Sequence, residues 1–146
     1  MRLTAKSEYG LLAVIDLACA AGQGPVSVRE VAERRNIPAK FLEQLLVSLR
    51  KAGIVTAVRG AHGGFTLVRD PQSTTVLDVV EALDGPLGSP ICDAEADGGC
   101  GRGSSCAASA VWWRAQYALR GVLGSTTIAD LASMQVQLDD AERCRA

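Results

Sequence analysis

The order of helical and strand-like patterns in the first half of the chain restricts its fold more than any other feature. Apolar residues recur at helical spacing over residues 5–21, which predicts a first amphipathic helix, and glycine and proline at 22–25 end it. Ser27 with Glu30 three residues later forms a capping box, so a second helix is predicted to begin there. That helix is expected to stop at 36–38, where the sequence reads Asn-Ile-Pro.

A third helix follows almost at once. It is predicted from Ala39 to about Arg50, and Gly53 lies where a glycine commonly ends a helix. Its buried stripe is expected to consist of Leu42, Leu45, Leu46 and Leu49.

A glycine-rich hairpin is predicted after the third helix. Residues 54–58 and 65–68 are β-prone, and the segment 59–64 between them contains three glycines. A further short helix is predicted over 75–83. Two helices joined by a short turn and followed by such a hairpin have the order of a winged helix-turn-helix. We therefore expect a mostly α fold with a small β-hairpin wing.

The second half of the chain changes character twice. Residues 85–105 contain six glycines and two prolines, so neither helix nor strand is predicted there. A helix that is apolar on most of its faces is predicted over 106–123, and such a helix must be buried on most of them. Because a chain of this size has little core left to cover it, we interpret this segment as a dimerisation helix.

These patterns divide the chain into four expected parts. A winged helix-turn-helix domain is expected over 1–84, with its first helix also packing at the dimer interface. A cysteine-rich loop is expected over 85–106, and the dimerisation helix with a short C-terminal helix over 107–134. The polar sequence over 135–146 is expected to be a disordered tail.

Charge is distributed unevenly along the chain. The formal net charge is −1, which by itself is unusual for a protein that binds nucleic acid. From 27 to 69, however, there are eight basic and three acidic residues, whereas from 70 to the end there are five basic and eleven acidic ones. A basic segment joined to an acidic one predicts a part that binds a polyanion and a part with another role.

The outer side of the third helix carries side chains that suit DNA. In a helix-turn-helix the second helix of the pair enters the major groove. Glu43 can accept a hydrogen bond from cytosine and Gln44 can pair with adenine, while basic side chains suit phosphates. The candidate DNA-binding residues are Lys40, Glu43, Gln44, Ser48, Arg50 and Arg59, the last at the root of the wing. An ordinary solvated helix face is the alternative, and the full order of elements favours DNA binding.

Three cysteines lie close together in the irregular stretch. Cys92, Cys100 and Cys106 are spaced C-x7-C-x5-C, and loops of this kind let several thiolates converge on one iron–sulfur cluster. Structural zinc commonly uses paired cysteines two to four residues apart, which are absent here, so zinc is the second choice. Incidental packing of the cysteines is the third. Cys19, in the first helix, and Cys144, in the tail, are excluded as ligands.

The apolar run at 11–21 does not read as a secretion signal. Asp16 interrupts it, and Glu8 lies where positive charge would be needed. No membrane span is expected either. We therefore expect a cytoplasmic protein, in which cysteines act as ligands or thiols rather than in disulfides.

The sequence resembles the iron–sulfur cluster and nitric-oxide-responsive repressors of the IscR/NsrR type. The resemblance covers roughly residues 1–132. It is carried by Met-Arg-Leu-Thr at 1–4, Phe-Leu-Glu-Gln-Leu at 41–45, Leu-Arg-Lys at 49–51, Val-Arg-Gly at 58–60, the glycines at 63–64, the three clustered cysteines and Thr-Ile-Ala-Asp-Leu at 127–131.

The resemblance implies a winged-helix homodimer with crossing long helices and a [2Fe-2S] or [4Fe-4S] cluster near the dimer interface. It places base or groove contacts at Glu43, Gln44 and Arg59. A histidine that serves as fourth ligand in one branch falls on Ser109 here, whereas the nitric-oxide-sensing branch uses an acidic residue at the position of Glu8. We expect Glu8 of the partner subunit to be the fourth ligand, with Ser109 or water as alternatives.

The leading hypothesis is a homodimeric transcription regulator, a repressor by resemblance. It would bind an inverted-repeat operator and respond to iron–sulfur status, nitric oxide or redox stress. The alternative is a cluster-free winged-helix regulator that uses thiol oxidation or a protein partner. An enzyme is not expected, because the sequence shows no nucleophile–base pair, no phosphate-binding loop and only one histidine.

Overall fold

The computed structural model describes residues 4–88 and 106–145. The elements are α1 (Ala5–Cys19), α2 (Val28–Arg35), α3 (Ala39–Lys51), β1 (Val55–Val58), β2 (Gly64–Leu67), α4 (Val76–Asp84), α5 (Ala107–Ser125) and α6 (Ile128–Arg145). The expected fold class, mostly α with a β-hairpin wing, is confirmed.

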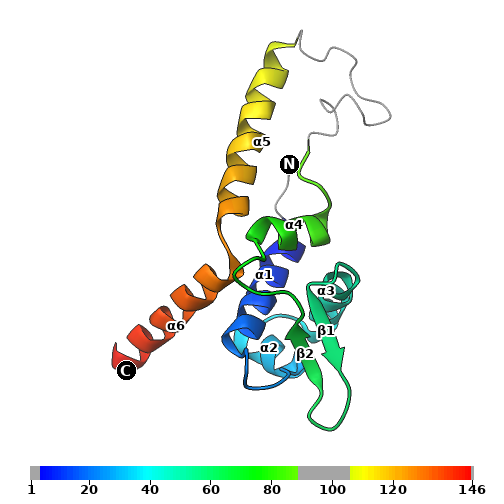
Figure 1. The fold of residues 1–146 in the computed structure, drawn as a ribbon, viewed down its shortest axis with the longest axis vertical. Helices are drawn as coiled ribbons and strands as arrows, with labels where there is room; N and C mark the ends of the chain where they lie inside the picture. The colour runs from blue at the N-terminus through cyan, green and yellow to red at the C-terminus, as the bar shows by residue number, and fades with distance from the viewer. Residues whose placement is uncertain (1–3, 89–105, 146) are drawn as a thin grey trace.

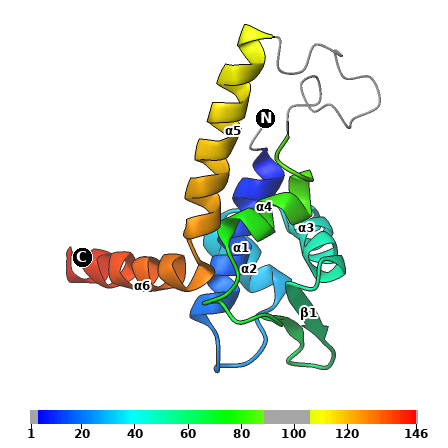
Figure 2. The ribbon, with the colours of Figure 1, turned by 45° about the horizontal axis from the view of Figure 1, so that its top comes forward.

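The helices α1 to α4 and the hairpin form one body, and α5 leads away from it (Figure 1). α1 lies against α2, α3, α4 and β2, so it is the central helix of this body. In both ribbon views α5 extends beyond α4, while α6 projects to the side after its first turns pass α1 (Figure 2). The body therefore presents α3 and the hairpin on one side and α5 on another.

Side-chain caps fix where the helices begin. Ser27 and Glu30 form the predicted capping box at α2, and Thr75 and Asp78 form a second one at α4. α2 ends at Asn36, which adopts a left-handed conformation with φ of 52° and so turns the chain sharply into α3. These local signals set the short α2–α3 turn of the helix-turn-helix.

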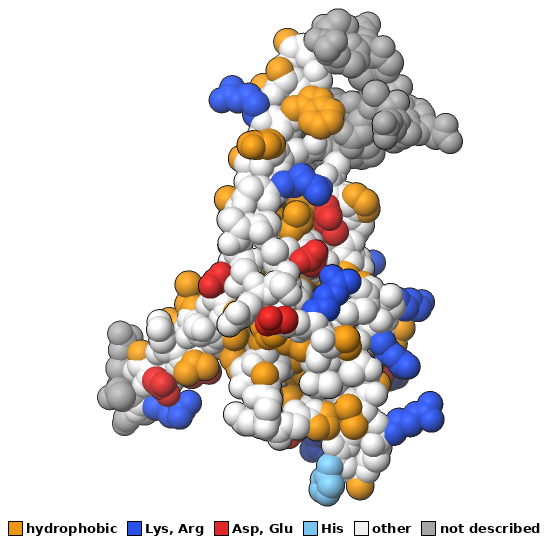
Figure 3. Space-filling model, in the orientation of Figure 1, with side chains coloured by type: hydrophobic (Ala, Val, Ile, Leu, Met, Phe, Trp, Pro, Cys, Tyr) orange, Lys and Arg blue, Asp and Glu red, His pale blue; other side chains and the backbone are white. Residues whose placement is uncertain are grey.

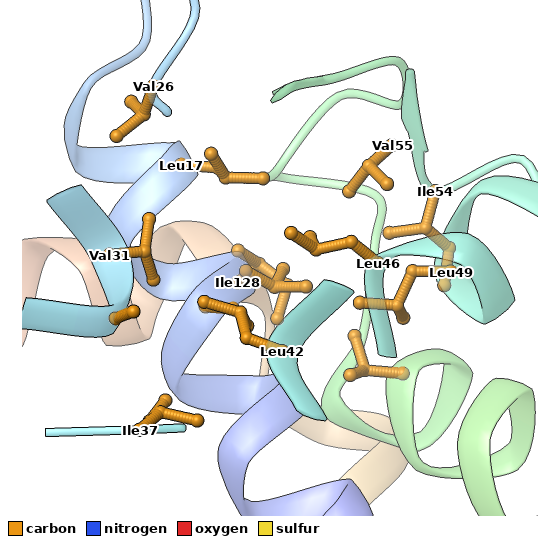
Figure 4. Packing of buried hydrophobic residues seen from close by; sticks show 14 residues of the cluster. Leu17, Val26, Val31, Ile37, Leu42, Leu46, Leu49, Ile54, Val55 and Ile128 are labelled. Carbon is orange, nitrogen blue, oxygen red and sulfur yellow. The ribbon is translucent and has the colours of Figure 1, made fainter. Parts of the chain in front are cut away.

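The main hydrophobic core lies between α1 and α3 (Figure 4). The predicted leucine stripe of α3 is buried, with Leu42 and Leu49 fully inaccessible. Ile128, the first residue of α6, is also fully buried in this core, beside Leu42 in Figure 4. A residue from beyond α5 thus completes the core of the N-terminal body.

A short antiparallel bridge of backbone hydrogen bonds joins the beginnings of α4 and α6. Thr75 and Thr127 form an isolated antiparallel bridge. The amide of Val76 donates to the carbonyl oxygen of Thr126 at 2.9 Å, and the amide of Ile128 donates to that of Thr74 at 2.9 Å. This bridge holds the junction between α5 and α6 against the segment that leads from the wing into α4.

α5 is held to the body at its C-terminal half. Leu119 and Leu123 of α5 pack against a second, smaller core formed by Val76, Val80 and Leu87. An ion pair between Arg120 Nη1 and Glu81 Oε1, 2.6 Å apart, joins α5 to α4 beside these contacts. The N-terminal half of α5 extends beyond them.

One sequence expectation about the C-terminus is wrong. The segment after Gln135 was expected to be a disordered tail, and the preceding helix was expected to be short. Instead α6 is a single helix from Ile128 to Arg145. Residues 128–145 contain neither glycine nor proline and consist largely of good helix formers, so a polar composition did not prevent a helix.

No helix in the described ranges is both long enough and apolar enough to span a lipid bilayer.

Candidate functional site

The outer face of α3 is exposed and carries mostly polar and charged side chains. Lys40, Glu43, Gln44 and Arg50 are all exposed, as the buried leucine stripe on the opposite side requires. Ser48 is only partly exposed, and its hydroxyl donates to the backbone carbonyl oxygen of Gln44 at 3.2 Å. The structure therefore brings five predicted DNA-binding residues onto one helix, with Ser48 at the edge of the face.

Two further side chains share this face and were missed in the sequence analysis. Lys51, in the last turn of α3, is exposed and adds positive charge. Val47 is exposed over 49% of its surface although it is apolar. Both follow Glu43 and Gln44 at helical spacing, so a helical wheel would have placed them on this face.

The hairpin presents Arg59 at the point where β1 ends. β1 and β2 pair antiparallel, with Val58 opposite Gly64, and Arg59 begins the exposed turn between them. A side chain on Gly64 would overlap the backbone of Val26, which forms an isolated bridge with Phe65. The glycine therefore lets the segment before α2 add to the sheet and hold the wing against the body.

A buried carboxylate holds α2 in place. Asp16 of α1 is 1% exposed and pairs with Arg34 and Arg35 at the end of α2. Because α2 packs directly on α3, these ion pairs also help to hold α3 in its position on the body.

Positive charge gathers where α3 and the hairpin meet the solvent. Figure 3 shows Lys and Arg side chains along the right-hand edge of the view, over α3 and the hairpin. The single histidine, His62, is exposed in the turn of the wing. Most of the acidic side chains in this view lie elsewhere, over α4 and α6. The arrangement agrees with the basic and acidic segments of the sequence and suits a polyanion on the α3 side.

Of the three clustered cysteines, the structure describes one. Cys106 is a partly exposed free thiol at the N-cap of α5. Ser109 is buried, and its hydroxyl donates to the carbonyl oxygen of Cys106 at 2.6 Å. Cys92 and Cys100 lie outside the described residues, so their convergence with Cys106 stays a prediction.

Two other predicted or excluded ligands are also described. Glu8 is exposed in the first turn of α1, where it is accessible to another molecule. Cys19 is partly buried on α1, with its sulfur 3.7 Å from the carbonyl oxygen of Ala132. Burial and the nearby charge of Asp16 raise the pKa of the Cys19 thiol. A raised pKa disfavours the thiolate form that a metal needs.

α5 exposes large apolar side chains along most of its length. The largest of them are Val111, Trp112, Trp113, Tyr117 and Val122, each more than half exposed. On this helix only Ser109 and Gln116 are buried among the described residues. Such a surface on a single chain is typical of an interface.

A protein-family model matches the sequence over most of the chain. The model, Rrf2, is described as an iron-dependent transcriptional regulator and matches residues 3–134. The chain belongs to the Rrf2 family. The resemblance noted in the sequence is thereby confirmed, and the chain is a DNA-binding transcriptional regulator rather than an enzyme.

Known Rrf2 relatives resemble the chain over nearly its whole length. The HTH-type transcriptional regulator IscR of Citrobacter koseri is 37% identical over 143 residues, which cover 98% of this chain and 86% of the relative. IscR of Escherichia coli K12 is also 37% identical, over 98% of this chain and 87% of its own.

The solved structures that are similar to this chain include both IscR and CymR proteins. CymR, the global cysteine regulator of Bacillus subtilis, is 35% identical with a TM-score of 0.77, covering 92% of this chain and 98% of its own. IscR of T. potens is 34% identical with a TM-score of 0.72, and the match covers 100% of this chain and 92% of the IscR chain. The oxidized form of Staphylococcus aureus CymR is 33% identical with a TM-score of 0.71, and the match covers 90% of this chain and 96% of the CymR chain.

Proposed function

We propose that the chain is a homodimeric repressor that binds an inverted-repeat operator and senses its signal through an iron–sulfur cluster. In this proposal residues 1–84 bind DNA, 85–106 hold the cluster and 107–134 form the dimer. The observation that carries the DNA-binding part is the exposed face of α3, which combines base-reading and phosphate-binding side chains opposite a buried leucine stripe. The partner of this face is double-stranded DNA.

Each residue of the DNA-binding surface has its own proposed role. Glu43 and Gln44 lie in the first half of α3 and are exposed, so they read base edges in the major groove. Lys40 and Arg50 contact phosphates on either side, and Ser48 contributes at the edge of the face. Arg59, in the exposed glycine-rich turn after β1, reaches the adjacent minor groove.

The dimer is supported by the exposed apolar side chains of α5. A second copy would cover them, because two such helices can cross and bury each other's aromatic residues. Sedimentation of purified protein tests this directly, with Trp113→Glu and Tyr117→Glu as variants. We expect both variants to sediment as monomers. Val68→Glu, at a valine beyond β2 that is 59% exposed, should remain dimeric.

The cysteine set supports a cluster by its chemistry. Cys106 opens α5, and the N-terminal end of a helix carries partial positive charge that favours an anionic ligand such as a cluster-bound thiolate. Cys106 would hold the cluster together with Cys92 and Cys100. When bound, an iron–sulfur cluster supplies a centre that is sensitive to oxidants and nitric oxide.

Glu8 of the partner subunit is the proposed fourth ligand. The Glu8 side chain is exposed in the first turn of α1, whereas the hydroxyl of Ser109 already donates to the carbonyl oxygen of Cys106. A carboxylate oxygen would complete a three-thiolate set with a weaker bond than a fourth thiolate would form. Such a ligand suits a centre that has to react with small molecules.

A cluster-free regulator is the second candidate, and the similarity to CymR favours it. The TM-score to Bacillus subtilis CymR, 0.77, is slightly above that to T. potens IscR, 0.72. An absorption spectrum of anaerobically purified protein, together with iron and sulfide analysis, separates the two candidates. Visible bands with bound iron and sulfide support the cluster. A colourless protein that contains zinc or no metal, even after cluster reconstitution, supports the alternative.

A further inference from the structure

Val47 is an apolar side chain in the middle of the polar DNA-facing surface. It is 49% exposed and belongs to neither hydrophobic cluster of the described residues. One turn before it lie Glu43 and Gln44, and one turn after it lie Arg50 and Lys51, all exposed. The valine therefore lies outside the cores of the described residues, with about half of its surface open to contact with another molecule.

A valine in this position is poorly suited to an exposed helix but well suited to a rigid contact. Valine is a weaker helix former than the lysine, glutamate and arginine around it. In a helix its branched side chain is held in essentially one rotamer, so both methyl groups of Val47 point in a fixed direction. A contact with them costs little side-chain entropy.

The major groove offers one apolar group on its base edges, the C5-methyl group of thymine. We propose that Val47 packs against a thymine methyl in each operator half-site and is a specificity-determining residue of this regulator. The inference rests on the proposed insertion of α3 into the major groove.

The position of this thymine follows from helix geometry. Gln44 and Val47 are three residues apart, which is a rise of about 4.5 Å along a helix axis. Base pairs are stacked about 3.4 Å apart. With α3 running along the groove, we therefore expect the thymine about one to two base steps from the base that Gln44 reads.

The test removes the apolar groups from each side of the contact in turn, the methyl group of thymine on the DNA and the two γ-methyl groups of Val47 on the protein. An operator duplex is selected from a random pool with the full-length protein, and each thymine is replaced in turn by uracil, which lacks only the C5-methyl group. We expect about fourfold weaker binding at one thymine per half-site, the ratio that corresponds to one buried methyl-sized group. Val47→Ala should bind the thymine and uracil operators equally.

Matched variants keep the result clear. Val47→Thr retains the shape of the side chain with one methyl group and should keep part of the preference for thymine. Val68→Ala, at an exposed valine outside α3, should discriminate as the wild type does. Equal binding of wild-type protein to all thymine and uracil operators overturns the proposal, and so does a preference for thymine that survives in Val47→Ala.

The same binding assay separates this inference from the proposed function. If Lys40→Ala and Gln44→Ala bind as the wild type does, α3 does not enter the groove and both proposals fail. If these two variants lose affinity or selectivity while uracil substitution has no effect, α3 reads DNA and only the role of Val47 is wrong.

Discussion

Arg35 Nε on α2 donates to Oδ1 of Asp16 on α1 at 2.7 Å, and this carboxylate is 1% exposed. Arg34 donates to the other oxygen of Asp16 at 3.1 Å. A charge so deeply buried is tolerated only when it is paired and hydrogen-bonded. The three side chains therefore form the polar connection that fixes α2 of the helix-turn-helix against the central helix.

Asp16→Asn is expected to destabilise the fold. The substitution keeps the size of the side chain but leaves the mostly buried guanidinium of Arg35 without its counter-charge. We expect the free energy of unfolding to fall by about 3 kcal/mol, measured by urea denaturation at equal protein concentration. The exposed pair between Arg29 and Glu33 provides the control, because Glu33→Gln should change the free energy of unfolding far less. Equal losses in the two variants would contradict this account.

Ile128→Ala is expected to destabilise the N-terminal body although residue 128 lies beyond α5. Its side chain is fully buried beside Leu42, so truncation leaves a cavity costing about 2–5 kcal/mol. Urea denaturation measures the loss. Val136→Ala, at a position on α6 that is 47% exposed, is the control and should change stability little. A loss of stability in Ile128→Ala as small as that in Val136→Ala would mean that α6 is not part of this core.

The parts of the fold that depend on local signals could be predicted from the sequence. The capping box at Ser27, the leucine stripe of α3 and the glycine after it all act within a few residues, and each lies where it was predicted. The exposed face of α3 followed from that stripe. Arg59 was predicted at the root of the wing because a β-prone run ends just before it and a glycine-rich turn follows it.

Contacts between distant segments could not be predicted in the same way. Nothing near Ile128 in the sequence indicates that it completes a core formed by α1 and α3. The pairing of Asp16 with two arginines of α2 also depends on how the helices cross. Val47 was overlooked because apolar residues in a helix are usually assigned to the core. The ligand set that includes Cys92 and Cys100 stays a prediction.

Stability is expected to fall in acid partly through Asp84. Burial raises the pKa of this carboxyl, but the hydroxyl and amide of Thr4 donate to it and hold its pKa below the ordinary value. The unfolded chain therefore binds a proton at a higher pH than the folded chain does. The stabilisation is present above the unfolded pKa of about 4 and is lost as the pH falls through the folded pKa.

Thr4→Val tests this pH dependence. The variant should be less stable than the wild type at pH values above the unfolded pKa of Asp84, and the difference should shrink in more acidic solution. Urea denaturation across this pH range measures it. Ser73→Ala removes a hydroxyl that donates to a backbone carbonyl oxygen instead of a carboxylate, so its effect should not change with pH. A pH-independent effect of Thr4→Val would contradict the assignment.

Arg59→Ala and Gln44→Ala are expected to weaken DNA binding in different ways. Loss of Arg59 should lower affinity for all sequences and reduce the dependence of binding on salt, because a charge next to the phosphates is removed. Loss of Gln44 should cost about 1–3 kcal/mol at one operator position and relax the preference there. Binding measured at several salt concentrations with matched and mismatched operators checks both. Unchanged selectivity in Gln44→Ala would exclude it as a base-reading residue.

Substitution of single ligands is expected to distinguish thiolate from carboxylate coordination. Ala at Cys92, Cys100 or Cys106 should remove the visible absorbance but leave a folded dimer. Cys19→Ala and Cys144→Ala are the controls and should keep the absorbance. Glu8→Ala should keep the cluster but shift its spectrum and alter its reaction with nitric oxide. A wild-type spectrum with unchanged nitric-oxide kinetics in Glu8→Ala would rule out Glu8 as a ligand.

The burial of Ile128 also bears on the order in which the protein is made. A ribosome synthesises α1 to α4 and the hairpin first, then the cysteine-containing segment and α5, and only afterwards the residue that closes the first core. The leucines of α3 consequently have an incomplete set of neighbours until α6 begins to emerge. A nascent or prematurely terminated chain that stops after α4 contains every proposed DNA-contacting residue but lacks the isoleucine that completes the core beneath them.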